Sequence, residues 1–502
     1  MKNNQIAYYL GSKILAAILN LITMAIFVRM GGKETYGAYI ILLAWAYMLY
    51  SITLQWLRFS FFACFKEEIT ADLITTYLRA LFWGFLGIIL ITSLSVVTGL
   101  ITLEFASAIT IIVIGLASYE ALTEIARTQL QARNVAIGVI MRAILMLLFG
   151  VIALIIKPSA FLLALAVGLA HLGASLHLLF LAKNLSKGHW SKTHMKSLWN
   201  YGRPLIPAFG LDSVGLQLDR LLLARFTTLE TVGVYGAAAD FIRQSMIVVA
   251  EAISGAYFTL ARKSAEEGNI KNTKAFLSEA FLAYTALTLL VGAFILRFDR
   301  LIFEMLFGAE MASAIEPIAA FIILSNIVAI YRAYYLSQAV YLTSSSQNML
   351  YSDGMQVVVT LLAGIGLVPV YGAIGAAIAM FLGQVAGSLL YIFTWRNHYI
   401  LQLPYDKAAI ILAVSIGVYT LTGFLETIIP SAPLVIILNI IIFAIVSAST
   451  AYHFNILSFK ALISKILNHT SLSTLPQDTV QKEASPKIDA KELDKKDTSC
   501  AS

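Results

Sequence analysis

Four polar residues recur within one long apolar run of this chain, at spacings that place them on one face of a helix. They are Asp240, Arg243, Gln244 and Glu251. Ionisable side chains inside apolar spans are costly and usually face a cavity or a partner. Arg243 is suited to binding a phosphate oxygen through its bidentate guanidinium, with Asp240 as its resting partner. The alternative is a purely structural pair between Asp240 and Arg243.

Charged residues in other apolar runs are further candidates. Asp212 and Asp219 are seven residues apart, so they share a helical face. Together with Glu251 and Glu120, they are the candidates for coupling transport to an ion. Glu120 also fits an interfacial face held by ion pairs. Arg220 has two open interpretations, because it can bind a ligand or extend along its stem to the membrane interface.

Three further arginines sit at the ends of apolar runs. Arg58 and Arg29 are secondary candidates for binding an anion. Arg332 is expected near the cytoplasmic end of its run, where it would act as an anchor of the topology.

These residues must be positioned by membrane-spanning helices. The chain is 59% hydrophobic and only 13% charged, whereas soluble domains carry about 25% charge. Its apolar runs are too long for barrel strands, so helices must satisfy the backbone. The first run is too long for a signal peptide and lacks a small-residue cleavage site. We count fourteen runs, with approximate limits 8–30, 37–57, 79–100, 105–124, 136–156, 159–182, 204–224, 232–258, 276–297, 315–335, 349–370, 371–395, 407–428 and 433–452.

The distribution of lysine and arginine predicts the orientation of these spans. Basic residues in the connecting segments favour one side by about three to one. By the positive-inside rule, this bias places both termini in the cytoplasm and agrees with an even number of spans. The segment 336–348 should also be cytoplasmic, yet it contains no basic residue.

An internal repeat divides the chain. The segment 29–39 (RMGGKETYGAY) recurs at 225–235 (RFTTLETVGVY), each time after the first span of a half. Six spans separate the copies, which predicts two parallel six-helix lobes around a central cavity, plus two extra C-terminal helices. Gly37 and Gly233 are expected to form tight turns that hold the first two helices of each lobe together. The expected parts are an N-terminal lobe, a basic linker, a C-terminal lobe, the extra pair and a disordered polar tail, at 1–182, 183–203, 204–395, 396–454 and 455–502.

Several classes of function have no support in the sequence. There is no glycine-rich phosphate loop followed by lysine, and the histidines show no metal-binding spacing. The two cysteines, Cys64 and Cys500, offer no disulfide framework. The net charge of +7 reports topology rather than nucleic-acid binding. We therefore expect no enzymatic activity, no cofactor, no metal site and no nucleic-acid partner.

Four short motifs resemble those of polysaccharide flippases. The segment 201–207 (YGRPLIP) resembles the family's "YGxPxxP" entry, and 218–223 (LDRLLL) followed by 230–235 (ETVGVY) resembles its "DR…vGxY" signature. The segments 31–37 (GGKETYG) and 370–377 (VYGAIGAA) resemble its "gxxxyG" and "yGaiGaA" elements. The order of these motifs extends the resemblance from residue 1 to about residue 400. Polysaccharide flippases belong to the multidrug/oligosaccharidyl-lipid/polysaccharide exporter superfamily.

This resemblance implies a flippase of the bacterial inner membrane. Its cargo would be an undecaprenyl-pyrophosphate-linked oligosaccharide, a repeat unit of O-antigen, capsule or exopolysaccharide, moved by alternating access. Proton or sodium gradients would drive it, and a polysaccharide polymerase and chain-length machinery are possible partners. The alternative is a cation-coupled exporter of drugs or small metabolites with the same architecture.

Overall fold

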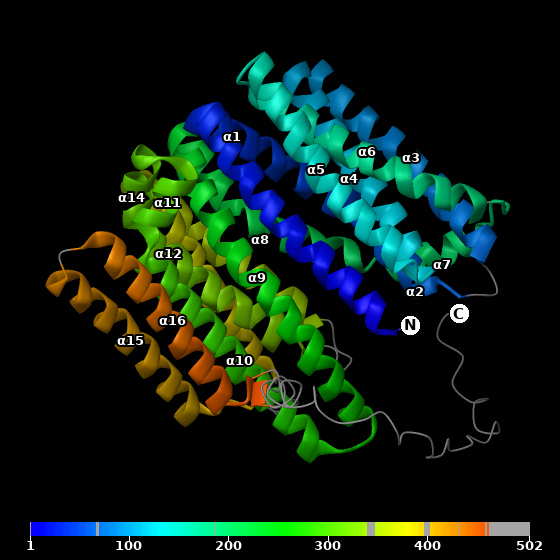
Figure 1. Ribbon diagram of the computed structural model, residues 1–502. Coiled ribbons are helices and arrows are strands. Elements are labelled where there is room, and N and C mark those ends of the chain that lie inside the picture. The colour runs from blue at the N-terminus through cyan, green and yellow to red at the C-terminus, as the bar shows by residue number, and fades with distance from the viewer. Residues whose placement is uncertain are drawn as a thin grey trace, which may run out of the picture.

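A computed structural model describes residues 2–66, 70–185, 187–338, 347–395, 402–429, 431–456 and 459–460 of the chain. This described part contains fifteen α-helices and one π-helical segment (Figure 1). Eleven of its helices are long and apolar enough to cross a bilayer. The predicted fold class, an all-α integral membrane protein, is therefore confirmed.

The helices form two groups with a connecting helix and a C-terminal pair. What we call the N-lobe contains α1 (Lys2–Thr53), α2 (Gln55–Cys64), α3 (Thr70–Val97), α4 (Leu103–Thr128), α5 (Ala132–Ile156) and α6 (Ala160–Leu185). The connecting helix is α7 (Lys192–Gly202). What we call the C-lobe contains α8 (Leu205–Phe226), α9 (Leu229–Glu266), α10 (Ile270–Arg297), α11 (Asp299–Phe307), α12 (Ala309–Ile330), the π-helical segment η2 (Tyr331–Leu336) and α14 (Gln347–Trp395). The last pair is α15 (Tyr405–Ile428) and α16 (Ala432–His453).

Two of these helices have double length, which accounts for the number of spans. α1 is broken at Gly32 (φ 78°) and α14 at Gly372 (φ 55°). Only glycine adopts such positive φ angles without strain, so each break ends one span and begins the next. α8, with 22 residues, adds a further helix of spanning length. Counted this way, the described residues contain the fourteen spans expected.

The predicted basic linker contains the short helix α7. The Ser191 side chain caps its N-terminus by accepting a hydrogen bond from the His194 backbone N–H. Trp199 packs edge-to-face on Trp56 of α2, with ring centroids 5.2 Å apart. Between α7 and α8 lie only residues 203–204, so this helix connects the N-lobe surface directly to the first span of the C-lobe.

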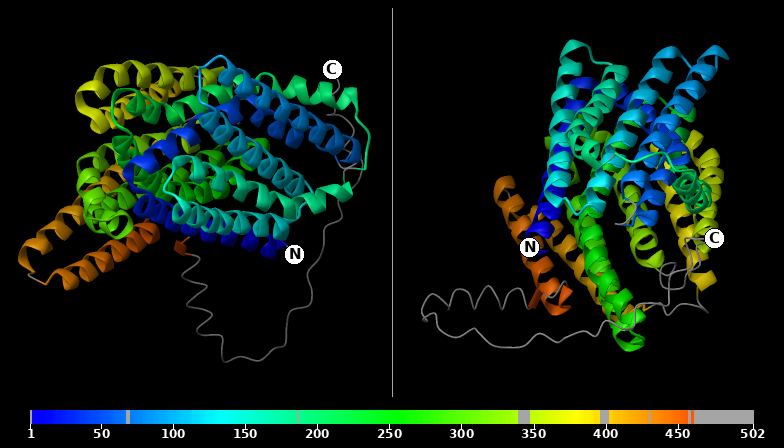
Figure 2. Two further views of the ribbon diagram at one scale, coloured as in Figure 1. Left: turned by 90° about the horizontal axis from the view of Figure 1, so that it is seen from above. Right: turned by 90° about the vertical axis from the view of Figure 1, so that its right-hand side faces the viewer.

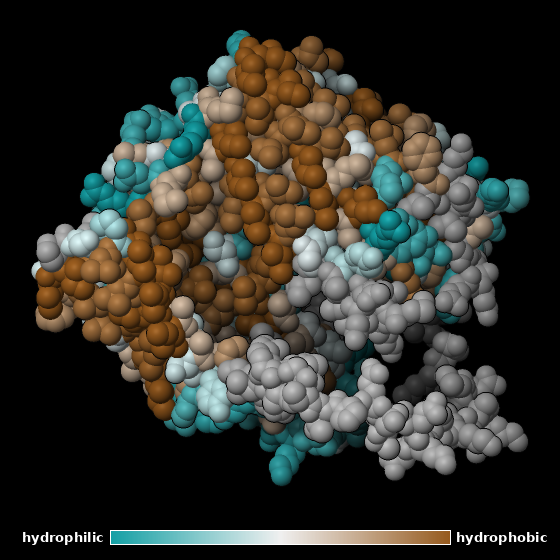
Figure 3. Space-filling model, in the orientation of Figure 1, coloured by the Kyte–Doolittle hydropathy of each residue, from teal (hydrophilic) through white to brown (hydrophobic). Residues whose placement is uncertain are grey.

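The surface of the bundle is apolar over a broad band with hydrophilic residues at its two ends (Figure 3). Large apolar side chains of the spanning helices are exposed, such as Leu90 at 68% and Phe180 at 74%, as expected where lipid replaces water. The α15–α16 pair projects from one edge and packs on α10 (Figure 2). An ion pair between Arg297 and Glu426 joins α10 to α15. The tail expected beyond residue 455 lies almost entirely outside the described residues.

The second half of α1 and helix α9 cross between the two lobes. They run in the same direction, because Gly37 lies against Gly233 and Ile40 lies against Gly236. We call the end of the bundle that carries the break at Gly32 the Gly32 end, and the other the opposite end. Contacts of α1 with α8 and α9 bring residues of both lobes to one central cavity.

Candidate functional site

A central cavity of about 210 Å³ lies between the two lobes. Its lining comes from α1, α5 and α6 on the N-lobe side and from α8 and α9 on the C-lobe side. The polar and aromatic residues of the lining are Asn20, Thr23, Phe27, Tyr36, Tyr39, Tyr47, Arg142, His171, Gln217, Arg220, Asp240, Arg243 and Gln244. A larger hollow between α3 and α4, about 500 Å³, is lined only by apolar and hydroxyl side chains. The central cavity is therefore the candidate site for a charged ligand.

The C-lobe wall of the cavity carries one carboxylate shared by two arginines. Oδ1 of Asp240 lies 2.5 Å from Nη2 of Arg220 and 3.0 Å from Nη2 of Arg243. The pair with Arg243 is the one expected from their spacing of three residues. Arg220 is only 5% exposed, so the interpretation that it extends to the membrane interface is wrong. Its deep position follows from the carboxylate that α9 presents to α8.

Buried hydrogen bonds of Asp219, the residue before Arg220 on α8, hold Arg220 in place. Asp219 accepts a hydrogen bond from the backbone N–H of Arg220 at 2.8 Å and another from the Tyr235 hydroxyl at 2.8 Å. Asp219 is 5% exposed and is absent from the cavity lining. It is a link between α8 and α9 behind the cavity wall.

The N-lobe wall presents a cation without a counter-charge. Arg142 of α5 makes no ion pair within the described part of the chain, and its Nε is buried without a hydrogen-bond partner. Its guanidinium stacks 5.5 Å from the ring centroid of Tyr119. That ring also packs edge-to-face on His171, whose Nδ1 lies 2.8 Å from the Val167 carbonyl oxygen. Arg142 is thus held by aromatic packing while its charge faces the cavity.

The cavity as a whole is electropositive. Three arginines and one aspartate line it, and Asp219 acts on Arg220 from behind the wall, so one positive charge remains when both carboxylates are counted. Arginine binds phosphate oxygens through two parallel hydrogen bonds, and a diphosphate supplies enough acceptors for arginines on both walls. The tyrosine rings offer faces on which a sugar can stack.

Solvent access to the cavity differs between its two ends. Toward the Gly32 end, Phe27, Tyr36 and Tyr39 are 1%, 3% and 3% exposed. Further along α1, toward the opposite end, Tyr47 is 37% exposed. The cavity is therefore packed tightly at the Gly32 end and more loosely toward the opposite end.

The remaining predicted anion-binding residues lie away from this cavity. Arg58 is engaged within the N-lobe, with Nη1 2.5 Å from Glu120 and Nε 2.9 Å from Glu124. Arg29 lies at the Gly32 end, where its guanidinium binds the carbonyl oxygens of Met305 and Leu306 at 2.6 and 2.9 Å. Both guanidinium groups already have partners in this conformation.

The predicted ion-coupling residues are dispersed. Glu120 is paired with Arg58, and Glu251 lies 2.8 Å from Lys13 at the opposite end. Asp212 is partly buried on α8, within electrostatic reach of Arg332 and of Asp353 on α14. In the described residues no group of three or more acidic, histidine or cysteine side chains could hold a metal ion.

A buried polar cluster in the C-lobe escaped the sequence analysis. Arg332 is 6% exposed and forms an ion pair with Asp353, which is 2% exposed. Its Nε donates to Gln384 at 2.8 Å. The interpretation of Arg332 as a surface anchor of the topology is therefore wrong. It joins η2 to both halves of α14, and no local spacing signals a contact between such distant segments.

Comparison with solved structures identifies the fold. No protein-family model and no curated protein matches the chain. A lipid II flippase, MurJ, in an inward closed conformation has a TM-score of 0.71 at 13% identity, covering 91% of this chain and 100% of that chain. An inward-facing multidrug resistance MATE transporter of the MOP superfamily has a TM-score of 0.54 at 15% identity, covering 78% and 94%. The eukaryotic MATE transporter AtDTX14 has a TM-score of 0.51 at 13% identity, and the match covers 82% of this chain and 98% of that chain. At these identities, the likeness shows a shared fold.

Proposed function

We propose that this chain is a flippase that moves an undecaprenyl-pyrophosphate-linked oligosaccharide across the bacterial inner membrane by alternating access. The observation that carries the proposal is the surplus of positive charge in the central cavity, above all the unpaired Arg142 facing Arg243 and Arg220. A pyrophosphate headgroup cannot cross hydrocarbon without such counter-charge. The fold shared with a lipid II flippase supports the same class of cargo.

In this proposal the opposite end faces the cytoplasm, together with both termini. The more loosely packed end of the cavity then receives the headgroup from the inner leaflet, while the prenyl tail stays in lipid. Arg142 takes one phosphate from the N-lobe side, and Arg243 takes the other after exchanging its contact with Asp240. Sugar units stack on Tyr47, which is 37% exposed.

Ion coupling and downstream partners belong to the same proposal. Asp212 is the best placed of the predicted coupling residues, because it is partly buried on α8 within electrostatic reach of Arg332 and Asp353. A proton or sodium ion at this position would alter the packing of the C-lobe. The product would be consumed on the outer face by a polysaccharide polymerase and its chain-length partners.

A cation-coupled exporter of drugs or metabolites is the second candidate. The likeness to multidrug transporters and the aromatic lining of the cavity favour it. A cationic drug, however, would enter a cavity with a surplus of positive charge. The sign of the preferred cargo therefore distinguishes the two candidates.

The proposal is tested with the full chain in vesicles that contain a fluorescent undecaprenyl-pyrophosphate-linked monosaccharide. Hydrogen bonds to charged groups contribute about 1.5–3 kcal/mol, so we expect Arg142→Gln to lower the initial flipping rate about tenfold or more. Arg262→Gln, at a 58% exposed side chain far from the cavity, is the matched control and should keep the wild-type rate. Wild-type flipping by Arg142→Gln, or transport of a cationic dye but no flipping, would contradict the proposal.

A further inference from the structure

The two copies of the internal repeat touch each other at their glycines. A Cβ atom at Gly37 would lie 1.9 Å from the carbonyl oxygen of Leu229, and a Cβ at Gly233 would lie 2.0 Å from that of Lys33. Lys33 and Leu229 occupy equivalent positions in the two copies, four residues before their glycines. Each copy thus receives the backbone of the other in the same way, at a crossing that only glycine permits.

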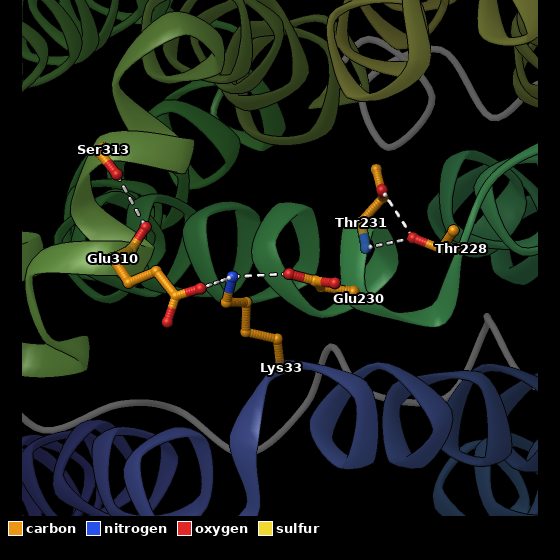
Figure 4. A network of polar contacts seen from close by, with 6 residues as sticks. All are labelled: Lys33, Thr228, Glu230, Thr231, Glu310 and Ser313. Atoms are coloured by element: carbon orange, nitrogen blue, oxygen red, sulfur yellow. Dashed lines mark hydrogen bonds and ion pairs between the residues drawn. The ribbon is translucent and has the colours of Figure 1, made fainter.

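Charged side chains border this crossing on one side (Figure 4). Nζ of Lys33 lies 2.6 Å from Oε1 of Glu230 on α9 and 2.5 Å from Oε1 of Glu310 on α12. The Lys33 side chain is 18% exposed, while Glu230 and Glu310 are 57% and 81% exposed, so these pairs lie at the edge of the crossing and add little to the close contact of the glycines. The Thr228 hydroxyl caps the start of α9 by accepting from the Thr231 N–H at 3.3 Å, which fixes the turn beside Glu230.

The contact between α1 and α9 at the opposite end is much weaker. Nζ of Lys13 lies 2.8 Å from Oε2 of Glu251, but the two side chains are 55% and 44% exposed. Exposed pairs of this kind contribute little to stability. The helix glycines at this end, Gly11 and Gly255, have open space where a Cβ would stand, with no atom within 4 Å, so their backbones are not in close contact.

We infer that the contact formed by Lys33, Gly37, Glu230, Gly233 and Glu310, here called the repeat clasp, is the closed gate of the Gly32 end and sets the balance between the two access states. The inference rests on alternating access in the proposed function. The lobes must separate at the clasp to release cargo there. The Lys13–Glu251 pair at the opposite end is formed in the same state, so it holds the two lobes together there while the clasp is closed.

Two cysteine pairs report the ends separately in a chain that lacks Cys64 and Cys500. The pair Arg29→Cys with Met305→Cys reports the Gly32 end without altering the clasp, because these residues touch across α1 and α11. The pair Lys13→Cys with Glu251→Cys reports the opposite end. Cross-linking with a short bismaleimide is measured in membranes, without any cargo.

Adding a methyl group at either glycine should prevent the clasp from closing. We expect Gly37→Ala and Gly233→Ala each to reduce cross-linking at the Gly32 end about tenfold and to leave it unchanged at the opposite end, where the reporter pair is already in contact. Lys33→Ala should reduce the yield at the Gly32 end by a smaller factor. Gly11→Ala and Gly255→Ala are matched controls on the same two helices and should leave both yields unchanged.

The outcomes separate this inference from the proposed cargo. Unchanged cross-linking in the glycine variants would overturn the clasp, and so would an equal loss at both ends, which indicates general loosening of the lobes. If only the yield at the Gly32 end falls while no lipid-linked sugar is flipped, the clasp stands and the cargo assignment fails.

Discussion

Replacing Asp353 with alanine is expected to destabilise the protein by about 3–5 kcal/mol, because it leaves the buried charge of Arg332 without a partner. Both side chains are nearly inaccessible, so water cannot take over the lost interaction. The remaining hydrogen bond from Arg332 to Gln384 does not neutralise the guanidinium. Thermal unfolding of the purified protein in detergent measures the effect.

Two further variants identify the cause of this loss. Glu266→Ala removes a 65% exposed partner of Arg262 on α9 and should change stability by less than about 1 kcal/mol. Replacing Arg332 with Met and Asp353 with Leu together removes both charges, and we expect it to recover most of the stability. If Asp353→Ala alone unfolds at the wild-type temperature, the ion pair does not hold η2 to α14.

The helices could be predicted because bilayer physics acts locally along the sequence. Each apolar run must satisfy its own backbone, so its length and composition indicate a helix before any packing is known. The two long helices that each contain two of the expected runs are broken at a glycine, Gly32 in α1 and Gly372 in α14. The limits of the five expected parts of the chain are not tested by the structure and remain predictions.

The candidate site could be predicted only where its residues share a helix. Asp240 and Arg243 are three residues apart, and their pairing follows from helical geometry. The second partner, Arg220, comes from another helix, and Arg142 comes from the other lobe. A lone arginine in an apolar run has the same sequence signature whether it faces lipid headgroups, a structural partner or a cavity. Only the assembled lobes distinguish these cases.

The internal repeat was also only a partial guide to the structure. It indicated the two-lobe architecture, but the expectation of tight turns at Gly37 and Gly233 was wrong. Both residues lie within continuous helix, and the turn that separates the first two spans is at Gly32. The two glycines allow the two copies of the repeat to contact each other. Copies that meet on a two-fold axis must have self-complementary surfaces, and glycine provides the required close approach.

The cavity and the proposed repeat clasp share one helix pair, so in the proposed function binding is coupled to gating. Asp240 and Arg243 follow Gly233 on α9, and Tyr39 follows Gly37 on α1. A headgroup that pulls Arg243 away from Asp240 therefore acts on the helix whose other end closes the clasp. Cargo can change the balance between access states only through such a difference in contacts between them.

Asp240 is the residue at which this coupling is most sensitive. Its carboxylate competes with an anionic cargo for Arg220 and Arg243. Opposite charges 4 Å apart interact by about 4 kcal/mol at an effective dielectric constant of 20, and partial exposure of Asp240 reduces that figure. We therefore expect Asp240→Asn to bind inorganic pyrophosphate about 10–100-fold more tightly, since each 1.4 kcal/mol is a factor of ten.

Tighter binding should slow transport in this variant. Without the carboxylate, no internal group displaces the phosphate from the arginines, so release on the far side becomes limiting and flipping falls about tenfold. Calorimetry with pyrophosphate and the vesicle assay measure the two effects. Asp406→Asn, an exposed carboxylate at the start of α15, is the control that removes the same charge outside the cavity. Weaker pyrophosphate binding by Asp240→Asn would show that Asp240 orients the arginines instead of competing for them.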